Sequence, residues 1–152
     1  MSKIIQLKDG NGNDIYPKSA KNIITASLTN NTSVTSNNRI PIDKVDAIVG
    51  NKLTLNNNKI VIGSGINYVK VSAMLSVQYN ASNTIYSGQI RLNSEDILIM
   101  RFWTYKSSTH VNSATSTTIL LKVKEGDVID FTLRDNSAVI RPETSITVEE
   151  VL

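Results

Sequence analysis

The chain has 152 residues, of which 19% are charged, with a formal net charge of +3 and no cysteine. One domain of this length can bury a core without covalent cross-links, and the lack of thiols excludes disulfide bonds and thiolate catalysis. The lysines lie singly along the sequence and no apolar run approaches the ~20 residues of a membrane span, so we expect no nucleic-acid partner, no membrane insertion and no secretion signal.

Residues 1–20 are expected to form a segment of their own. A short strand at residues 4–7 precedes Asn11-Gly12, a dipeptide that strongly favours a two-residue hairpin turn. A lone hairpin is only marginally stable in water. We therefore predict that this segment packs on its own domain, on symmetry mates or on a larger assembly, and that residues 21–152 form the main domain.

The rest of the chain consists of short runs in which apolar and polar residues alternate. In residues 68–77 every second residue is apolar, beginning with Val69, and a period of two indicates a half-buried β-strand. Similar runs, separated by clusters of Asn, Ser, Thr and Gly, predict strands at residues 24–28, 39–42, 52–55, 59–62, 97–105, 119–123 and 129–133. Because there is no helical period and no repeat of 20–50 residues, the sequence predicts an all-β sandwich or barrel.

One predicted strand has large apolar residues on both faces. Leu98, Met100 and Phe102 lie on one face and Ile97, Ile99 and Trp103 on the other, which is more apolar surface than one sandwich interior needs. Two further apolar residues lie on the outward side of the strand at 68–77. The candidates for a subunit interface are therefore Tyr68, Met74, Met100 and Phe102. The alternative is that a loop of the same chain covers them.

Several segments follow one another in the order found in a known family. They are residues 26–35, 39–42, 49–53, 59–62, 65–73, 90–93, 120–129 and 145–150. The most specific are Gly-x-x-Tyr-x-x-x-Ser-Ala at 65–73 and Lys-x-Gly-Asp-x-Ile at 124–129. Together they resemble the jelly roll of complement globular heads and tumour-necrosis-factor-like (TNF-like) proteins, in the form found on bacteriophage fibres and spikes. This resemblance implies an antiparallel ten-stranded jelly-roll β-sandwich that assembles into a homotrimer.

The sequence offers no catalytic constellation built on histidine. His110 is the only histidine, it lies in a polar run of residues 107–116, and no Gly-x-Ser-x-Gly motif is present. Adjacent carboxylates such as Glu95-Asp96, which we place in a turn, and Glu149-Glu150 do not form the spaced pair that glycoside cleavage requires. We therefore predict a protein that is not an enzyme.

A metal site is not predicted either. Asp9, Asn11 and Asn13 imitate the start of a calcium-binding loop, but Asp14 stands where that loop needs Gly and Ala20 where it needs Glu. This segment is interpreted as a turn. We expect neither a metal nor a cofactor.

Ligand contacts are expected in loops, where Ser, Asn and Tyr side chains suit polar recognition. The predicted loops span residues 79–87 and 106–116, and the candidate contact residues are Tyr79, Tyr86, Tyr105 and His110. Trp103 and Tyr105 share one side of their strand. They either stack on a sugar ring or belong to the core or a subunit interface.

Residues 3–17 are similar to the leader of small tail and head fibre proteins of phages that infect Gram-positive bacteria. That resemblance implies attachment to other virion proteins, whereas an edge hairpin added to the sandwich is the alternative. We expect a bacteriophage virion structural protein that binds carbohydrate or protein on the host surface through many weak contacts. The alternatives are a bacterial surface or spore-coat module of the same fold and a polysaccharide depolymerase.

Overall fold

The computed structural model describes residues 7–8, 14–15, 21–78, 84–106 and 112–151. These residues form fourteen strands, and no helix among them is long and apolar enough to cross a membrane. In chain order the strands are β1 (Leu7–Lys8), β2 (Asp14–Ile15), β3 (Ile23–Ser27), β4 (Thr32–Val34), β5 (Lys44–Val49), β6 (Leu53–Asn56), β7 (Lys59–Ile62), β8 (Tyr68–Gln78), β9 (Thr84–Leu92), β10 (Glu95–Lys106), β11 (Asn112–Lys122), β12 (Val128–Arg134), β13 (Ala138–Ile140) and β14 (Ser145–Glu150).

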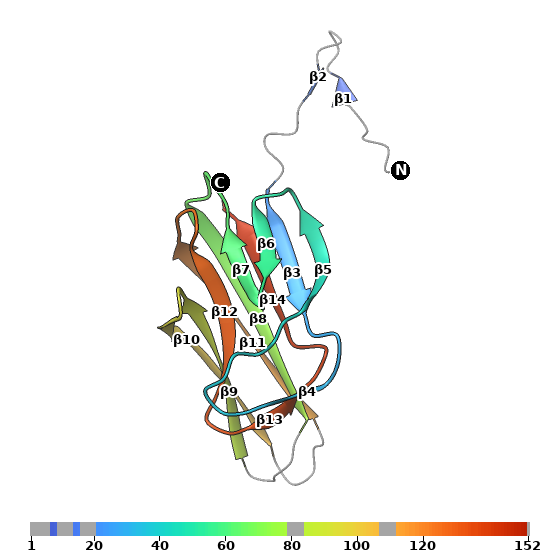
Figure 1. Cartoon of the computed structure of the whole chain (residues 1–152), viewed down its shortest axis with the longest axis vertical. Coiled ribbons are helices and arrows are strands. Elements are labelled where there is room, and N and C mark those ends of the chain that lie inside the picture. Colours follow the sequence, from blue (N-terminus) through green and yellow to red (C-terminus); the bar gives the residue numbers. More distant parts are fainter. Residues whose placement is uncertain (1–6, 9–13, 16–20, 79–83, 107–111, 152) are drawn as a thin grey trace.

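Two antiparallel sheets form the two layers of a sandwich (Figure 1). The five-strand sheet has the order β10-β9-β12-β7-β6. The seven-strand sheet has the order β4-β13-β8-β14-β3-β5, and β11 pairs with β8 along its full length. The antiparallel all-β sandwich predicted from the period of two is confirmed.

The N-terminal strands β1 and β2 pair with each other in a two-stranded sheet. Their register places Leu7 opposite Ile15 and Lys8 opposite Asp14. Figure 1 draws this pair beyond the end of the sandwich at which β3 begins. The predicted pairing of two N-terminal strands is therefore present, while Asn11-Gly12 lies outside the described residues.

The core lies between the two sheets and follows from the alternation. On β8, the odd-numbered residues from Val69 to Val77 are 4% exposed or less. On the facing sheet, Phe131 of β12 stacks on Phe102 of β10, with ring centroids 5.6 Å apart. Gly88 of β9 makes room for both rings, because a Cβ there would lie 2.5 Å from Phe131 Cε2 and 2.8 Å from Phe102 Cζ.

Several predicted boundaries are wrong. Residues 39–42 form no strand and make only an isolated bridge from Arg39 to Thr132, although Ile40 and Ile42 are buried. The predicted loops are shorter, because β9 begins at Thr84 and β11 at Asn112. Glu95 begins β10, since the turn before it consists of Asn93 and Ser94, both with positive φ. The short strands β4, β5 and β13 were not predicted.

A polar clasp closes one end of the seven-strand sheet. The side chain of Asn22 donates to a Glu150 carboxylate oxygen at 2.6 Å and accepts from the backbone N–H groups of Asn51 and Lys52, each at 3.1 Å. Gly50 has φ +75, and a Cβ there would lie 2.1 Å from Asn22 Oδ1. Glycine at this position therefore allows the chain between β5 and β6 to approach Asn22.

Candidate functional site

The outward face of the five-strand sheet carries large exposed apolar side chains at one edge. In the register of β9 and β10, Tyr105 lies opposite Ile85, and Trp103 opposite Ser87. Phe102 and Thr104 are buried, so Trp103 and Tyr105, which alternate with them, face outward. Trp103 and Tyr105 are each 58% exposed, and Ile85 is 48% exposed. The two aromatic residues therefore lie outside the core of the chain, next to Ile85 on the surface.

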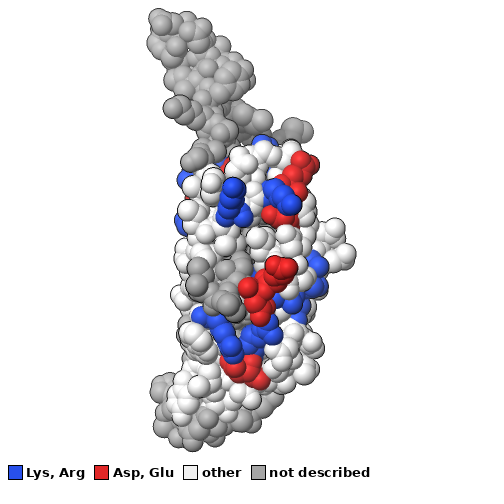
Figure 2. All heavy atoms as spheres, turned by 90° about the vertical axis from the view of Figure 1, so that its left-hand side faces the viewer, with Lys and Arg blue, Asp and Glu red and all other residues white. Residues whose placement is uncertain are grey.

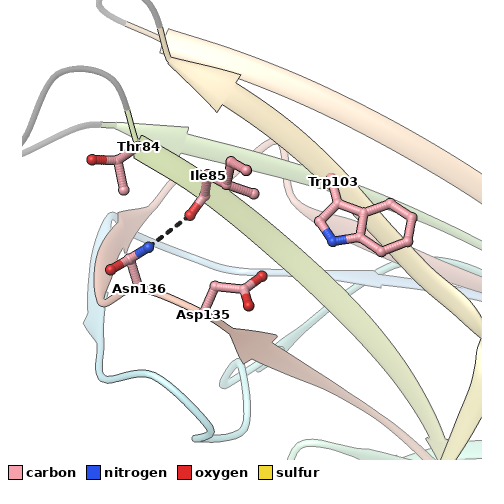
Figure 3. A pocket seen from close by; sticks show the side chains of 5 residues that line it. All are labelled: Thr84, Ile85, Trp103, Asp135 and Asn136. Carbon is pink, nitrogen blue, oxygen red and sulfur yellow. Dashed lines mark hydrogen bonds between the residues drawn. The ribbon is translucent and has the colours of Figure 1, made fainter.

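Trp103 and Ile85 line an open hollow of about 460 Å³. Its other lining residues are Thr84, at the start of β9, and Asp135 and Asn136, in the turn between β12 and β13. Figure 3 shows the indole of Trp103, the side chain of Ile85 and the two polar side chains of the turn around this hollow. An apolar wall with a few polar groups is the usual composition of a ligand site.

Hydrogen bonds hold the polar groups of the hollow in place. Asn136 Nδ2 donates to the backbone oxygen of Ile85 at 2.9 Å, drawn as the dashed line in Figure 3. The Asp135 carboxylate accepts from the hydroxyl of Ser87, which is fully buried, and from the guanidinium of Arg101. The turn is therefore tied to both β9 and β10, which gives the hollow preorganised polar groups.

Paired charges continue from this hollow over the same sheet. Asp130 of β12 is fully buried, and it accepts from Arg91 Nε at 2.6 Å and from Arg39 Nε at 3.1 Å. The hydrogen bonds to this carboxylate raise the pKa of Arg91. Arg134 pairs with Asp96. Figure 2 shows positive and negative side chains next to one another on the side of the molecule at the left of Figure 1.

These ion pairs bear on the kind of ligand that the face can take. Each arginine named above contacts a carboxylate, and because Arg39 and Arg91 share Asp130, the four arginines and three aspartates leave a net charge of only +1 for a polyanion. Within the described ranges, no group of three or more His, Cys, Asp or Glu side chains is placed to hold a metal ion. The chemistry that the hollow offers is stacking on an aromatic ring and hydrogen bonding to a carboxylate and an amide.

Among the predicted ligand residues, Tyr86 requires a correction. Its side chain is 1% exposed and faces the core, because the even-numbered residues of β9 point inward, so it cannot contact a ligand at the surface. Tyr105 is exposed and stays a candidate. Tyr79 and His110 lie outside the described residues. The predicted site missed Asp135 and Asn136, which come from a turn about 50 residues along the chain from Ile85.

Among the predicted interface residues, Phe102 also requires a correction. It is 5% exposed and belongs to the core, where it stacks on Phe131. Tyr68 is 44% exposed and Met74 is half-buried, both on the outward side of β8. They stay candidates for a subunit interface. The side chain of Met100 lies outside what the structure describes.

The outward face of the seven-strand sheet is built mainly from short hydroxyl side chains. One row crosses four adjacent strands, β11, β8, β14 and β3, and consists of Thr118, Ser72, Thr147 and Thr25. Hydroxyl hydrogen bonds join Ser72 to Thr118 at 3.0 Å and Thr25 to Thr147 at 2.9 Å. The next row has an ion pair of Lys70 and Glu149 at 2.6 Å at its centre, with Leu120 exposed beside it. The sequence alone could not reveal this face of short side chains, because its residues are brought side by side only by the strand register.

No family model matches the chain, and no curated protein sequence matches it either. Solved structures do match. Murine APRIL at pH 5.0 superimposes with a TM-score of 0.69 at 10% identity, over 87% of this chain and 100% of that chain. An Eiger TNF from S. frugiperda gives 0.66 at 10% identity, over 87% and 92% of the two chains. The globular domain of zebrafish complement 1qA gives 0.65 at 8% identity, over 87% and 98%.

These matches concern the fold, because identities of 8–10% carry no further likeness. They confirm the fold that the order of the sequence segments implied. The chain has the jelly-roll fold of TNF-like and complement globular-head domains.

Proposed function

We propose that this protein is the non-enzymatic, homotrimeric binding head of a bacteriophage fibre or spike, attached to the virion through its N-terminal segment. The order of the sequence segments and the similarity of residues 3–17 to phage fibre leaders support the phage assignment. The main support for the trimer is the composition of the outward face of the seven-strand sheet. It combines short, mutually bonded hydroxyls with exposed apolar residues, and such a face suits a large contact with a copy of itself.

The contact between copies is expected around Tyr68 and Leu120. These side chains are 44% and 58% exposed and project from adjacent strands of one sheet face, β8 and β11. Burying such side chains stabilises association by about 25 cal/mol per Å² of apolar surface. The row of short side chains from Thr118 to Thr25 contains no bulky group that would keep two copies apart.

Adhesion by such a head would be multivalent. Three copies per spike and many spikes per particle raise a weak contact by about 10²–10⁴ in avidity without any new contact. A weak site on each head therefore suffices for firm attachment to a bacterial surface. Carbohydrate or protein of the host surface is the expected ligand.

Particle association tests the phage assignment. Particles are purified on a density gradient from a culture that carries the gene, and fractions are probed with antibody to the chain. We expect the chain to sediment with particles that contain capsid protein. Recovery from spore coats or the cell envelope instead would favour the structural module of a bacterial surface, and release of reducing ends from wall polysaccharide by the pure protein would favour a depolymerase.

Deleting residues 1–20 tests the attachment segment. The truncated chain should keep the oligomeric state and melting temperature of the full chain, because a lone hairpin adds little stability. Its incorporation into particles should fall sharply, which sedimentation with virions measures. A truncated chain that still enters particles refutes the attachment role, and a truncated chain that melts several degrees lower or precipitates shows an integral edge hairpin instead.

A further inference from the structure

The hollow beside Trp103 combines features that its packing within the chain does not explain. Trp103 keeps 58% of its surface exposed, and Ile85 and Tyr105 beside it keep 48% and 58%. Single exposed apolar residues are common, but three that are neighbours in the register of two strands form a patch. A tryptophan dominates the energetics of any surface that covers it, because its ring is large and rigid. This patch therefore favours a ligand with an apolar face.

The polar side of the hollow has unused hydrogen-bonding capacity. A carboxylate offers about four lone-pair positions, and Asp135 accepts from Ser87 and Arg101. Asn136 uses one N–H of its amide on Ile85, and among the described residues the second N–H and the oxygen have capacity for a ligand. Asp135 can thus accept hydrogen bonds from hydroxyl groups, while Asn136 can both donate and accept.

We propose that this hollow binds one ring of a neutral saccharide. The C–H groups on one face of a pyranose carry partial positive charge and stack on the electron-rich face of the Trp103 indole. The hydroxyl groups at the ring edge donate to the Asp135 carboxylate and exchange hydrogen bonds with Asn136. The proposal deepens the proposed function, since it names the ligand class through which the head would adhere.

The charges around the hollow select a neutral ring over an anionic one. Asp135 repels a phosphate or carboxylate group, and the guanidinium of Arg101 already pairs with Asp135. A phosphate-binding site presents an arginine or lysine whose charge is available to the ligand. The hollow lies on the outward face of the five-strand sheet, whereas the proposed trimer face belongs to the other sheet, so both surfaces can be occupied at once.

Intrinsic fluorescence reports on this site directly, because Trp103 is the only tryptophan in the chain. The full-length protein is titrated, with excitation selective for tryptophan, with glucose, galactose, rhamnose and N-acetylglucosamine, with neutral wall polysaccharide, and with glycerol phosphate. At least one neutral sugar should give a saturable change with a Kd on the order of 1 mM, as expected for a ligand of this size. Glycerol phosphate should give none.

Variants assign the binding to the hollow. Asp135→Ala should weaken the affinity at least tenfold, whereas Glu125→Gln, at the other end of β12, should leave it unchanged. Because Trp103→Ala lacks the tryptophan that the titration reads, its binding is followed by saturation-transfer NMR, and the signal of the sugar ring should be lost. Circular dichroism confirms that each variant is folded, and Trp103→Phe keeps an aromatic ring and should retain part of the binding.

Three results would overturn the proposal. The first is the absence of a saturable change with any neutral sugar or polysaccharide, and the second is binding that survives Asp135→Ala. The third is emission that shifts with protein concentration alone, because another copy would then cover Trp103. The titration needs neither a particle nor a trimer. A head that binds sugar but is absent from virions would refute only the phage assignment, and a virion head that binds none would refute only the saccharide site.

Discussion

The outward faces of the two sheets differ in chemistry although both belong to one sandwich. On the seven-strand sheet, short hydroxyl side chains such as Ser72 and Thr118 bond to one another across the strands. On the five-strand sheet, arginines pair with aspartates, and Trp103 stands exposed beside a hollow. A flat face with internally satisfied hydroxyls offers little to a small ligand but suits a broad contact, while a concave face with an exposed indole suits a ligand. The proposed trimer contact and the proposed ligand site follow from this contrast.

The largest loss of stability is expected when the buried charge of Asp130 is removed from the five-strand sheet. Asp130→Ala leaves Arg91 and Arg39 without the carboxylate that both contact, and removing one partner of a buried ion pair costs about 3–5 kcal/mol. Urea denaturation measures the loss. Asp135→Ala breaks a partly exposed pair with Arg101 and removes the acceptor of the buried Ser87 hydroxyl, so it should cost less, about 1–2 kcal/mol. Equal losses for the two variants would contradict the difference between a buried and a partly exposed ion pair.

Two glycines separate the effect of packing from that of backbone strain. Gly88→Ala should lower stability by about 1–3 kcal/mol, because the new Cβ would lie 2.5 Å from the Phe131 ring in the core. A Cβ added at Gly126 has no atom within 4 Å, so Gly126→Ala should cost only the backbone strain of its φ of +83, about 1–2 kcal/mol. Gly126→Val in the same turn should also destabilise. Thermal melting ranks the variants, and an unchanged midpoint for Gly88→Ala would contradict the tight contact.

The smallest expected effect is a loss of folding stability at acidic pH, caused by Glu150 at the end of the seven-strand sheet. The side-chain amide of Asn22 lowers the pKa of Glu150 below its ordinary value of 4.5, and the backbone N–H of Asn22 adds to this while burial opposes it. A lowered pKa in the folded state adds stability above 4.5, and this stability is lost as the pH falls through the lowered value. Glu150→Gln should flatten this part of the melting profile against pH. An unchanged slope would contradict the role of the Asn22 clasp.

The sequence could predict those strands whose burial differs between their two faces. The alternation from Val69 to Val77 defines β8 because only one of its faces meets the core. The first half of β11 could not be predicted, since residues 112–118 are polar except for Ala114 and form a strand because they pair with β8 along its length. In β10 the alternation was visible, but apolar residues on both faces gave no sign of which face was buried. Phe102 was therefore assigned outward in error.

The candidate site could be predicted only in part. The shared side of Trp103 and Tyr105 followed from the period of two, and a sugar-stacking role was one of its interpretations. Asp135 and Asn136 are distant from Trp103 in the sequence and reach it through the turn after β12, so no local pattern connects them. Tyr86 was assigned to a loop because residues 79–87 are rich in Asn, Ser and Thr. In the structure β9 pairs with β10 and β12, and the side chain of Tyr86 points into the core.

The most direct test of the division between the two faces is the molar mass of three proteins in solution, measured by light scattering at micromolar concentration. We expect three times the 16.7 kDa of one chain for the unaltered protein and for Trp103→Ala, and a single chain mass for Leu120→Lys, which puts a charge on the seven-strand face. A monomeric unaltered protein would contradict the proposed trimer contact. So would a trimer that survives Leu120→Lys and is lost in Trp103→Ala.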